Sequence, residues 1–201
     1  MRGADANVAD RVNPTESEGR GRVPSADLAA FWEWIVNEQV VLVCGSAGAG
    51  KSTWAAKLEA DGYLWMSFDR TAWAAGHREH PVSEAVAASV HAELRARLVE
   101  AVQAGRRVVV DTSFWSRAAR QSYRELLAPL GIVPVVHYLR ASEATMRERV
   151  ARRSGAGPDE VIVPKDLMTR YLAGFEVPTA DEGPLRVIEN PWDGSAPRPV
   201  E

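Results

Sequence analysis

Residues 45–52, which read GSAGAGKS, constrain the fold of this chain more than any other segment. They fill every fixed position of the pattern G-x-x-x-x-G-K-[ST], and they directly follow the apolar run VVLVC, which is typical of a buried strand. The glycines let successive backbone N–H groups point inward without a Cβ clash, and a helix beginning near Lys51 would add the positive end of its dipole. The segment therefore predicts a strand, a phosphate-binding loop and a helix, rather than a glycine-rich turn without a ligand.

The positions of this loop have expected roles. Its backbone would surround the phosphates of a ligand, and Lys51 would reach the β- and γ-phosphates. The Ser52 hydroxyl would bind Mg²⁺. The residues that we expect to contact the ligand are Gly45, Ser46, Ala47, Gly48, Ala49, Gly50, Lys51 and Ser52. A purine nucleoside triphosphate with Mg²⁺ is therefore the expected ligand.

The length and composition indicate an ordinary globular protein. The 201 residues suffice for one domain with a substantial core, and 46% of them are hydrophobic and 25% charged. We expect a disordered tail at residues 1–22, one domain at residues 23–190 and a Pro-rich tail at residues 191–201. No apolar stretch approaches the roughly 18 to 20 residues that span a bilayer, and residues 1–22 lack the apolar segment of a secretory signal.

Charge and cysteine content narrow the class further. The formal net charge of −3 gives no overall attraction to nucleic acid, although it leaves room for a local basic channel. Cys44 is the only cysteine, so a disulfide framework within one chain is impossible and a cytoplasmic protein is expected. Its position at the end of an apolar run predicts a small buried thiol rather than a reactive one.

Strand-like and helix-like segments alternate along the chain. Strands are expected at residues 40–44, 63–68, 107–111, 132–139 and 185–188. Helices are expected at residues 25–38, 51–60, 83–104, 116–127, 142–153 and 164–173, with residues 70–81 irregular. This alternation predicts parallel βαβ units, and therefore a three-layer α/β/α sandwich. Ligands of such sheets bind at the carboxyl ends of the strands.

Two acidic residues follow predicted strands and would reach that edge of the sheet. Asp69 comes directly after the second predicted strand, where a carboxylate can accept the proton of an attacking hydroxyl. Its alternative role is the cap of a turn or helix. Asp111 closes the apolar run VVVD, which places a carboxylate beside Mg²⁺ and its waters. A contact with the acceptor substrate and a cap for the helix near Ser116 are its alternatives.

Arg149 and Arg153 share one face of the helix predicted at residues 142–153. Phosphoryl transfer requires cations over the equatorial oxygens of the transferred group, and a guanidinium supplies them in a suitable fork. A solvated face is the alternative, because Arg147 and Arg152 lie on the same helix with acidic residues as partners. Beside a complete phosphate loop, we expect Arg149 and Arg153 to be catalytic.

Histidines and tryptophans give weaker signals. His77 and His80 are close in sequence but lack further ligands nearby, which is weak support for a metal site. Trp65, Trp73 and Trp115 lie near the expected crevice, where an indole can stack on a planar acceptor. Core packing is the simpler interpretation for Trp65, whereas Trp73 stands in the irregular stretch and is the better candidate for a pocket.

Arg117, Arg120 and Arg124 form a stripe along one face of the helix predicted at residues 116–127. Such a stripe can meet the phosphates of an acceptor or line a channel for nucleic acid. We favour a solvent-exposed face, because charged stripes on helices usually lie in water.

Several segments carry a resemblance to a known family. They are residues 45–53, SFD at residues 67–69, VVVDT at residues 108–112, MRERVARR at residues 146–153 and GFEVP at residues 174–178. Over residues 40–189 the chain resembles the compact P-loop kinases of the polynucleotide-kinase, chloramphenicol-phosphotransferase and zeta-toxin-like group. The resemblance implies a P-loop NTPase fold with a five-stranded parallel sheet in the order 2-3-1-4-5. It also implies a small helical lid at about residues 146–175.

The same resemblance implies a donor, an acceptor and further residue roles. ATP would be the donor and a hydroxyl group the acceptor. Thr53 would contact the α-phosphate and Asp69 the acceptor hydroxyl, while Arg149 and Arg153 would act from the lid. The adenine would lie between the lid helix and the loop near residues 175–179.

Together these features predict an ATP-dependent kinase for a hydroxyl group on a small molecule, such as an antibiotic, a nucleoside or a sugar-like compound. A 5′-hydroxyl polynucleotide kinase is the first alternative, and it requires a basic channel leading to Asp69. A nucleotide-switched binding protein with slow hydrolysis is an alternative of another class. We expect a small-molecule partner ahead of a nucleic acid and no membrane partner.

Overall fold

The structure is a computed structural model that describes residues 38–78 and 81–189. The helix predicted at residues 25–38 lies outside these ranges except for its last residue. The predicted tails at residues 1–22 and 191–201 also lie outside them, so the domain limits drawn from the sequence stay predictions.

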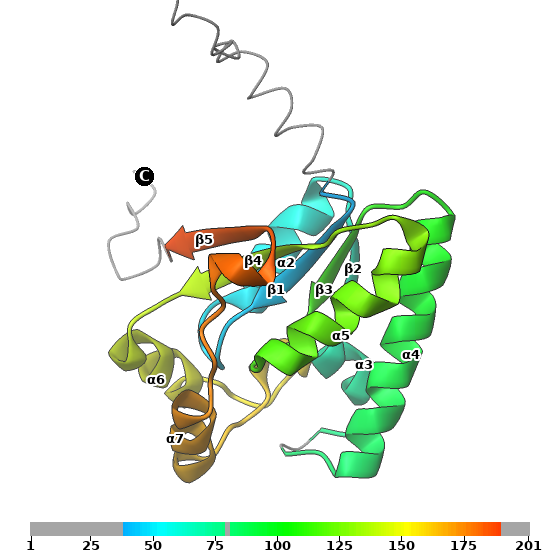
Figure 1. The fold of residues 1–201 in the computed structure, drawn as a ribbon. Helices are drawn as coiled ribbons and strands as arrows, with labels where there is room; N and C mark the ends of the chain where they lie inside the picture. The colour runs from blue at the N-terminus through cyan, green and yellow to red at the C-terminus, as the bar shows by residue number, and fades with distance from the viewer. Residues whose placement is uncertain (1–37, 79–80, 190–201) are drawn as a thin grey trace, which may run out of the picture. The chain divides into compact units, whose positions relative to one another are not determined.

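A parallel sheet of five strands organises the described part of the chain (Figure 1). The strands are β1 (Val40–Cys44), β2 (Leu64–Ser67), β3 (Val108–Asp111), β4 (Val135–Arg140) and β5 (Leu185–Glu189). Their spatial order is β2-β3-β1-β4-β5, and all neighbouring pairs are parallel. This order and direction confirm the expectation from the sequence.

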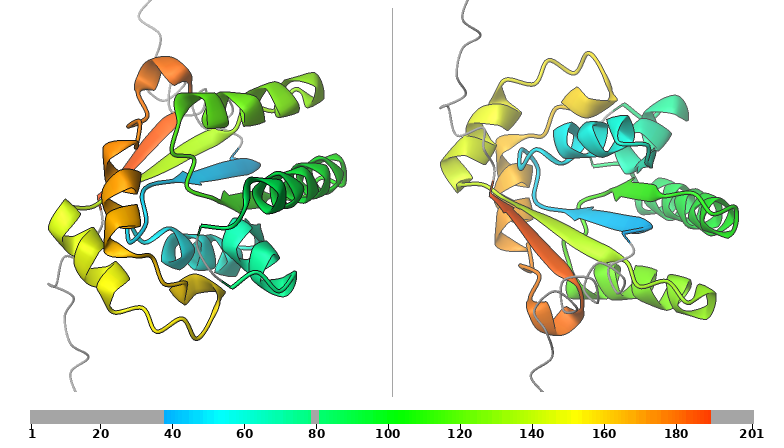
Figure 2. Two further views of the ribbon diagram at one scale, coloured as in Figure 1. Left: turned by 90° about the horizontal axis from the view of Figure 1, so that it is seen from below. Right: turned by 90° about the horizontal axis from the view of Figure 1, so that it is seen from above.

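Helices lie on both faces of the sheet (Figure 2). They are α2 (Lys51–Ala60), α3 (Phe68–Ala74), α4 (Glu84–Gln103), α5 (Arg117–Leu127), α6 (Glu143–Ala151) and α7 (Lys165–Ala173). Short 3₁₀ turns are η1 (Ala128–Leu130), η2 (Pro158–Glu160) and η3 (Ala180–Glu182). Helix α2 packs on one face and helices α4 and α5 on the other, which confirms the three-layer α/β/α P-loop NTPase fold. Among the described helices, none has the length and apolar character needed to cross a membrane.

The alternating side chains of β1 divide the core into two halves. Val40 and Leu42 face α4 and α5, where Leu98 is fully buried. Val41 and Val43 face α2. Because both faces of β1 are covered, its apolar run is continuous rather than alternating. Burial of each such side chain contributes roughly 1.5–3 kcal/mol, so β1 is a firm support for the loop that follows it.

The boundary between β2 and α3 differs from the expected one. β2 ends at Ser67 and α3 begins at Phe68, so Asp69 lies in the first turn of a helix and not at the tip of a strand. The Ser67 side chain accepts a hydrogen bond from the Arg70 N–H and caps the helix, which ends the strand at that residue. Residues 70–74 are therefore helical, and the prediction that they are irregular is wrong.

The start of β4 also differs from the expected one. The strand begins at Val135 rather than at residue 132. The Ile132 N–H donates to the Leu127 carbonyl oxygen and closes the end of α5, while Pro134 has no N–H to offer the sheet. Both features delay the first ladder hydrogen bond of the strand.

The carboxyl ends of β1, β2 and β3 lie side by side. Val43 pairs in register with Asp111, and Asp111 pairs with Ser67. Helices α6 and α7 lie at this same end of the sheet (Figure 1). The loop after β1, the last residue of β3 and the start of α3 therefore share one edge, where parallel sheets bind their ligands.

Candidate active site

The loop between β1 and α2 adopts the backbone that its glycines permit. Gly48 and Gly50 have φ values of +79° and +97°, in the region that side chains disfavour. A Cβ atom on Gly48 would also collide with the Met146 carbonyl oxygen, so the loop and α6 touch backbone to backbone. Helix α2 begins at Lys51, directly after Gly50, so the positive end of its dipole points at the loop. The loop is thus preformed for an anion.

Lys51 folds back over this loop. Its Nζ atom donates to the Ser46 carbonyl oxygen at 3.2 Å. Burial of the ammonium group lowers the pKa of Lys51, and the Arg153 guanidinium adds to that shift. The carboxylates of Asp111 and Asp69 oppose it. The loop, the two acids and Arg153, from the region predicted as the lid, therefore lie close to one another.

Asp111 is buried with one oxygen atom unpaired. The residue is only 4% exposed, and within the described residues nothing hydrogen-bonds its Oδ2 atom or the Ser46 hydroxyl. Burial raises the pKa of Asp111 to about 6, while Lys51 and a hydrogen bond with Ser52 oppose the rise. Since Ser116 caps α5, the capping alternative for Asp111 is wrong. A buried unpaired carboxylate oxygen beside a hydroxyl fits the oxygen donors that Mg²⁺ prefers.

Asp69 enters the site from the first turn of α3. Because Ser67 caps that helix, the capping alternative for Asp69 is wrong. The charge of Asp69 opposes the lowered pKa of Lys51 and adds to the raised pKa of Asp111. Burial, and then the Asp69 carboxylate, raise the pKa of Tyr171 in α7. Asp69 therefore lies close to the phosphate loop, to the end of β3 and to α7.

Arg149 and Arg153 both turn toward the phosphate loop. Arg149 Nη1 donates to the Gly48 carbonyl oxygen at 3.3 Å. Arg153 Nη1 donates to the Val161 carbonyl oxygen at 3.1 Å, and its charge acts on Lys51. Both guanidinium groups are thus held beside the place where phosphates would bind.

Arg147 in α6 and Arg152 at its C-terminal cap form the solvated face considered from the sequence. Arg147 pairs with Glu143 at 2.7 Å, and Arg152 pairs with Glu148 at 2.5 Å. Both pairs join residues one helical turn apart on the exposed side. Helix α6 ends at Ala151, so the predicted helix at residues 142–153 is too long and Arg153 lies just beyond it, where its N–H donates to the Val150 carbonyl oxygen. Arg149 and Arg153 therefore lie on the loop side, and Arg147 and Arg152 lie in solvent.

A further ion pair joins α3 to the segment between α6 and α7. Arg70 Nη2 donates to Asp159 Oδ2 in η2 at 2.9 Å, with the two side chains 43% and 36% exposed. The Arg70 guanidinium also lies over the Trp65 ring, 3.4 Å from its centroid. The region predicted as the lid thus contacts the phosphate loop through α6 and the acid-bearing helix α3 through η2.

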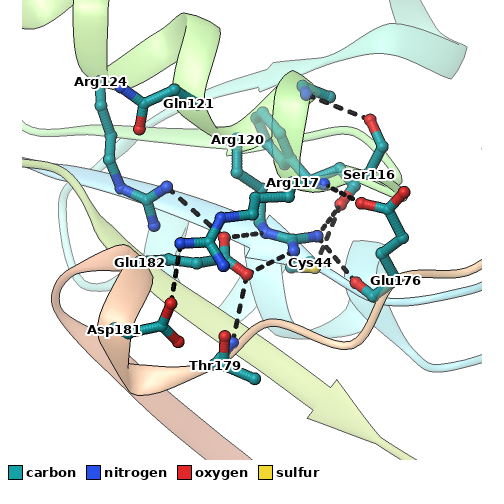
Figure 3. Close-up of polar contacts among 12 residues, drawn as sticks. Cys44, Ser116, Arg117, Arg120, Gln121, Arg124, Glu176, Thr179, Asp181 and Glu182 are labelled. Atoms are coloured by element: carbon teal, nitrogen blue, oxygen red, sulfur yellow. Dashed lines mark hydrogen bonds and ion pairs between the residues drawn. The ribbon is translucent and has the colours of Figure 1, made fainter.

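The arginine stripe of α5 faces acidic residues of the segment before β5 (Figure 3). Arg120 is fully buried and donates to both carboxylate oxygens of Glu182, each at 2.7 Å. Arg124 also faces Glu182 at 3.6 Å, and Arg117 pairs with Asp181 at 2.8 Å. The expectation of a solvent-exposed face is wrong for Arg120, because the segment before β5 closes over it.

The sequence contains an indication that Arg120 is buried, which the regular spacing of the three arginines obscured. Arg120 shares its helix face with Tyr123 and Leu127, which are both buried. Thr179 and Glu182 form a capping box, whose spacing is visible in the sequence. A charged residue on an apolar stripe indicates a buried partner, and a fixed acid elsewhere in the chain is a candidate for that partner.

The remaining aromatic and histidine candidates have other surroundings. Trp73 is half-buried in α3, with the Arg78 guanidinium 4.8 Å from its ring centroid, and Trp115 is exposed. His77 is exposed, and His80 lies outside the described residues. Across residues 38–78 and 81–189, no group of three or more His, Cys, Asp or Glu residues is arranged to hold a metal ion.

A comparison with sequence families places these features in context. The model of the AAA domain family matches residues 40–178. The chain belongs to this family. The match begins at β1 and runs through the phosphate loop, both acids, α6 and α7. A comparison with curated proteins gives no significant match for this AAA domain protein.

Solved structures resemble this AAA domain protein in fold. A gluconokinase from Sinorhizobium meliloti aligns at 23% identity with a TM-score of 0.53, over 75% of this chain and 81% of that chain. A sugar kinase from a Janibacter species aligns at 18% identity with a TM-score of 0.55, over 75% and 84%. Kti12 from Chaetomium thermophilum, in complex with ADP-AlF3, aligns at 21% identity with a TM-score of 0.53, over 77% and 89%. The shared fold and the family match confirm the resemblance to the P-loop kinase group.

Proposed function

We propose that this protein transfers the γ-phosphate of ATP to a hydroxyl group of a small molecule. The observation that carries the proposal is the meeting of Lys51, Asp69 and Asp111 at the phosphate loop. A protein that only binds a nucleotide needs one carboxylate near Mg²⁺, whereas a kinase gains from a second one that receives the proton of the acceptor. Fold neighbours named gluconokinase and sugar kinase support the same reaction class and a small hydroxyl compound as acceptor.

The phosphate loop supplies the binding of the donor in this proposal. Its backbone N–H groups and Lys51 hold the β- and γ-phosphates, and Thr53 in the first turn of α2 contacts the α-phosphate. Ser52 and Asp111 hold Mg²⁺, which when bound neutralises negative charge on the phosphate oxygens. The unpaired Oδ2 atom of Asp111 supports this assignment over a contact with the acceptor.

The transfer step uses Asp69 and the lid arginines. The acceptor oxygen attacks the γ-phosphorus while its O–H bond breaks, and the proton passes to the Asp69 carboxylate. The bond from the γ-phosphorus to the bridging oxygen breaks, and ADP leaves. The positive charges of Arg149 and Arg153 stabilise the negative charge on the equatorial oxygens. Hydrogen bonds to backbone carbonyl groups already hold both guanidinium groups near the loop.

The polynucleotide kinase alternative loses the feature that favoured it. Arg120 and Arg124 share Glu182, and Arg117 faces Asp181, so each arginine of the stripe already has an acidic partner in the same chain. A channel for a nucleic acid backbone needs cations that are not already matched in this way. The nucleotide-switch alternative differs from a kinase in its product, because a switch forms no phosphorylated acceptor.

The direct test is transfer of label from γ-labelled ATP in the presence of Mg²⁺. The acceptor panel contains sugars, nucleosides, antibiotics with hydroxyl groups and 5′-hydroxyl oligonucleotides. We expect a labelled phosphate ester of a small molecule. Label in an oligonucleotide would support the polynucleotide kinase instead, and label found only in inorganic phosphate would support the nucleotide switch.

The substitution Asp69→Asn tests the role of the second carboxylate. We expect kcat to fall by about 10²-fold while the ATP dissociation constant stays unchanged, as for a positioned base. Asp166→Asn is the control, because Asp166 is an exposed carboxylate of α7 paired with Arg170. Loss of activity in step with loss of folded protein would contradict the role of Asp69 in proton transfer.

A further inference from the structure

The Arg120 guanidinium lies fully buried at the centre of a hydrogen-bond network (Figure 3). Its Nε and Nη2 atoms donate to the two carboxylate oxygens of Glu182, each at 2.7 Å. Its Nη1 atom donates to the backbone carbonyl oxygens of Phe114 and Glu176, each at 2.9 Å. One side chain of α5 therefore fixes both the loop after β3 and the segment before β5.

The loop after β3 is strained at Phe114. This residue has a φ of +44°, and among the described residues other than glycine it is the only one with a positive φ. Such a conformation costs roughly 1–3 kcal/mol and persists only where the surroundings fix it. The Phe114 carbonyl oxygen accepts from Arg120 and, at 3.5 Å, from the Cys44 thiol. Burial raises the pKa of Cys44 to about 11, so the thiol keeps the proton that it donates, which fits the buried thiol predicted from the sequence.

This strained loop supports the start of the phosphate loop. The Gly45 N–H donates to the Ser113 carbonyl oxygen at 3.2 Å. Ser113 directly precedes Phe114, whose own carbonyl oxygen is fixed by Arg120. The Arg120 network thus reaches Gly45 through one backbone hydrogen bond, while Cys44, the residue before Gly45, is held independently by its pairing in the sheet.

The segment before β5 lies beside the phosphate loop as well. Phe175 stacks on Tyr138 of β4, with ring centroids 5.9 Å apart and the planes 20° from parallel. Tyr138 pairs in register with Cys44, the last residue before the phosphate loop. Glu176, whose carbonyl oxygen Arg120 holds, directly follows Phe175. An aromatic pair at the edge of the loop is thus anchored by the Arg120 network.

The aromatic pair and the acids lie on opposite sides of the phosphate loop. Asp111 ends β3 and Asp69 lies in the first turn of α3, directly after β2, whereas Tyr138 belongs to β4. In the sheet, β1 lies between β3 and β4. Attacking and leaving oxygens are roughly in line during phosphoryl transfer. An acceptor beside the acids therefore places the nucleoside of the donor on the opposite side, next to Tyr138 and Phe175.

We propose that Arg120 is a positioning residue for the nucleoside of the donor. Through Glu182 and the Glu176 carbonyl oxygen it holds the segment that carries Phe175, and with it the wall of the site formed by the aromatic pair. The inference rests on the proposed nucleotide site and is independent of the identity of the acceptor. Loss of the network is expected to weaken contacts with the base and ribose more than contacts with the phosphates.

Two probes separate these contacts in calorimetric titrations of the full chain. ATP with Mg²⁺ occupies the whole site, whereas tripolyphosphate with Mg²⁺ occupies only the phosphate loop. In Arg120→Lys a cation still faces Glu182, but the ammonium lacks the fork that reaches four oxygen atoms. We expect the ATP dissociation constant to rise about 10-fold and that of tripolyphosphate to change by less than about 2-fold. Arg120→Met is expected to give the same pattern with a larger effect, and Arg120→Lys carries the test where Arg120→Met does not fold.

Arg117→Met is the matched control. Arg117 lies on the same helix and contacts the same segment through Asp181, but it is exposed, so both dissociation constants should stay unchanged. Unchanged ATP binding in folded Arg120→Lys would overturn the inference, and equal weakening of both probes would do the same. Failure of the wild-type protein to bind either probe would overturn the inference and the proposed function together. Intact ATP binding without label transfer to any acceptor would overturn only the proposed function.

Discussion

The phosphate-loop cluster (Lys51, Asp69 and Asp111) and the Arg120 clamp (Arg120 and Glu182) both place charges away from water, but they differ in how their polar atoms are paired. The Oδ2 atom of Asp111 has no hydrogen-bond partner among the described residues. The Arg120 guanidinium, in contrast, donates to four oxygen atoms at 2.7 to 2.9 Å. A buried polar cluster with an unpaired atom can bind a ligand, whereas a cluster whose polar atoms are all paired stabilises the fold.

The two clusters also shift the pKa values of their carboxyl groups in opposite directions. Burial dominates at Asp111 and raises its pKa to about 6. The hydrogen bonds from Arg120 dominate at Glu182 and lower its pKa. Hydrogen bonds therefore stabilise the charge of Glu182, whereas burial disfavours the charge of Asp111 despite the nearby Lys51.

The largest expected effect tests whether the phosphate-loop cluster works with the lid arginines in the transition state. Arg153→Met should lower kcat by about 10³-fold, because an arginine over the transferred group stabilises charge that develops during transfer. The ATP dissociation constant should change far less. Arg152→Met is the control from the neighbouring position, since Arg152 is 74% exposed and paired with Glu148. An unchanged kcat in Arg153→Met would contradict a catalytic role and support the alternative of a solvated side chain.

The next effect compares the clusters directly by urea unfolding without ligands. Glu182→Gln should lower the free energy of unfolding by about 3 to 5 kcal/mol, because it leaves the Arg120 charge buried without its partner. Asp111→Asn should leave the free energy of unfolding unchanged or higher, because it removes a buried charge that lacks a full set of partners. Similar losses of unfolding free energy in the two variants would contradict the distinction between a cluster that stabilises the fold and one that binds a ligand.

A pH titration extends the comparison to a buried group outside both clusters. Burial lowers the pKa of His137 to about 4, and Trp54 Nε1 donates to its Nδ1 atom at 3.0 Å, which requires the neutral ring. Its contribution to stability is complete above the unfolded pKa of about 6.5 and is lost as the pH falls toward 4, with a total of about 3 kcal/mol. Urea unfolding between pH 7 and pH 4 should therefore be less pH-dependent in His137→Gln. Parallel curves for the variant and the wild type would contradict this origin.

The smallest effect concerns the exposed ion pair between α3 and the lid region. Arg70→Ala should lower the free energy of unfolding by less than about 1 kcal/mol, because the pair with Asp159 is largely in water. Arg97→Ala, which removes the exposed pair with Glu93 in α4, should have a similar effect on stability. Only Arg70→Ala should raise the KM for ATP, because only that pair joins α3 to the lid region. Equal KM values for ATP in the two variants would contradict a role of Arg70 in nucleotide binding.

The sequence predicts the phosphate loop and the sheet well because both depend on local patterns. The glycines at residues 45, 48 and 50 and the apolar run before them need no distant partner to be interpreted. The continuous apolar runs of β1 and β3 likewise report burial on both faces. The strand order followed from the resemblance to P-loop kinases and is confirmed by the structure.

The sequence does not predict features that depend on partners far along the chain. The partner of Arg120 lies 62 residues away, and without it the stripe on α5 looks like a solvated face. Asp69 is helical because Ser67 caps α3. From the sequence, an apolar run followed by an acid predicts instead that Asp69 ends a strand. Both errors arise where a polar side chain has a specific partner that periodicity cannot reveal.

The measurement that tests the central claim most directly is calorimetric binding of ATP with Mg²⁺ to the wild-type protein and to Lys51→Ala. Lys57→Ala serves as the control, because Lys57 is an exposed lysine of the same helix. The phosphate-loop cluster predicts binding at one site in the wild type and in Lys57→Ala, and a loss of about 10²-fold or more in affinity in Lys51→Ala. Equal affinity in all three proteins would contradict the claim that a nucleotide completes this cluster.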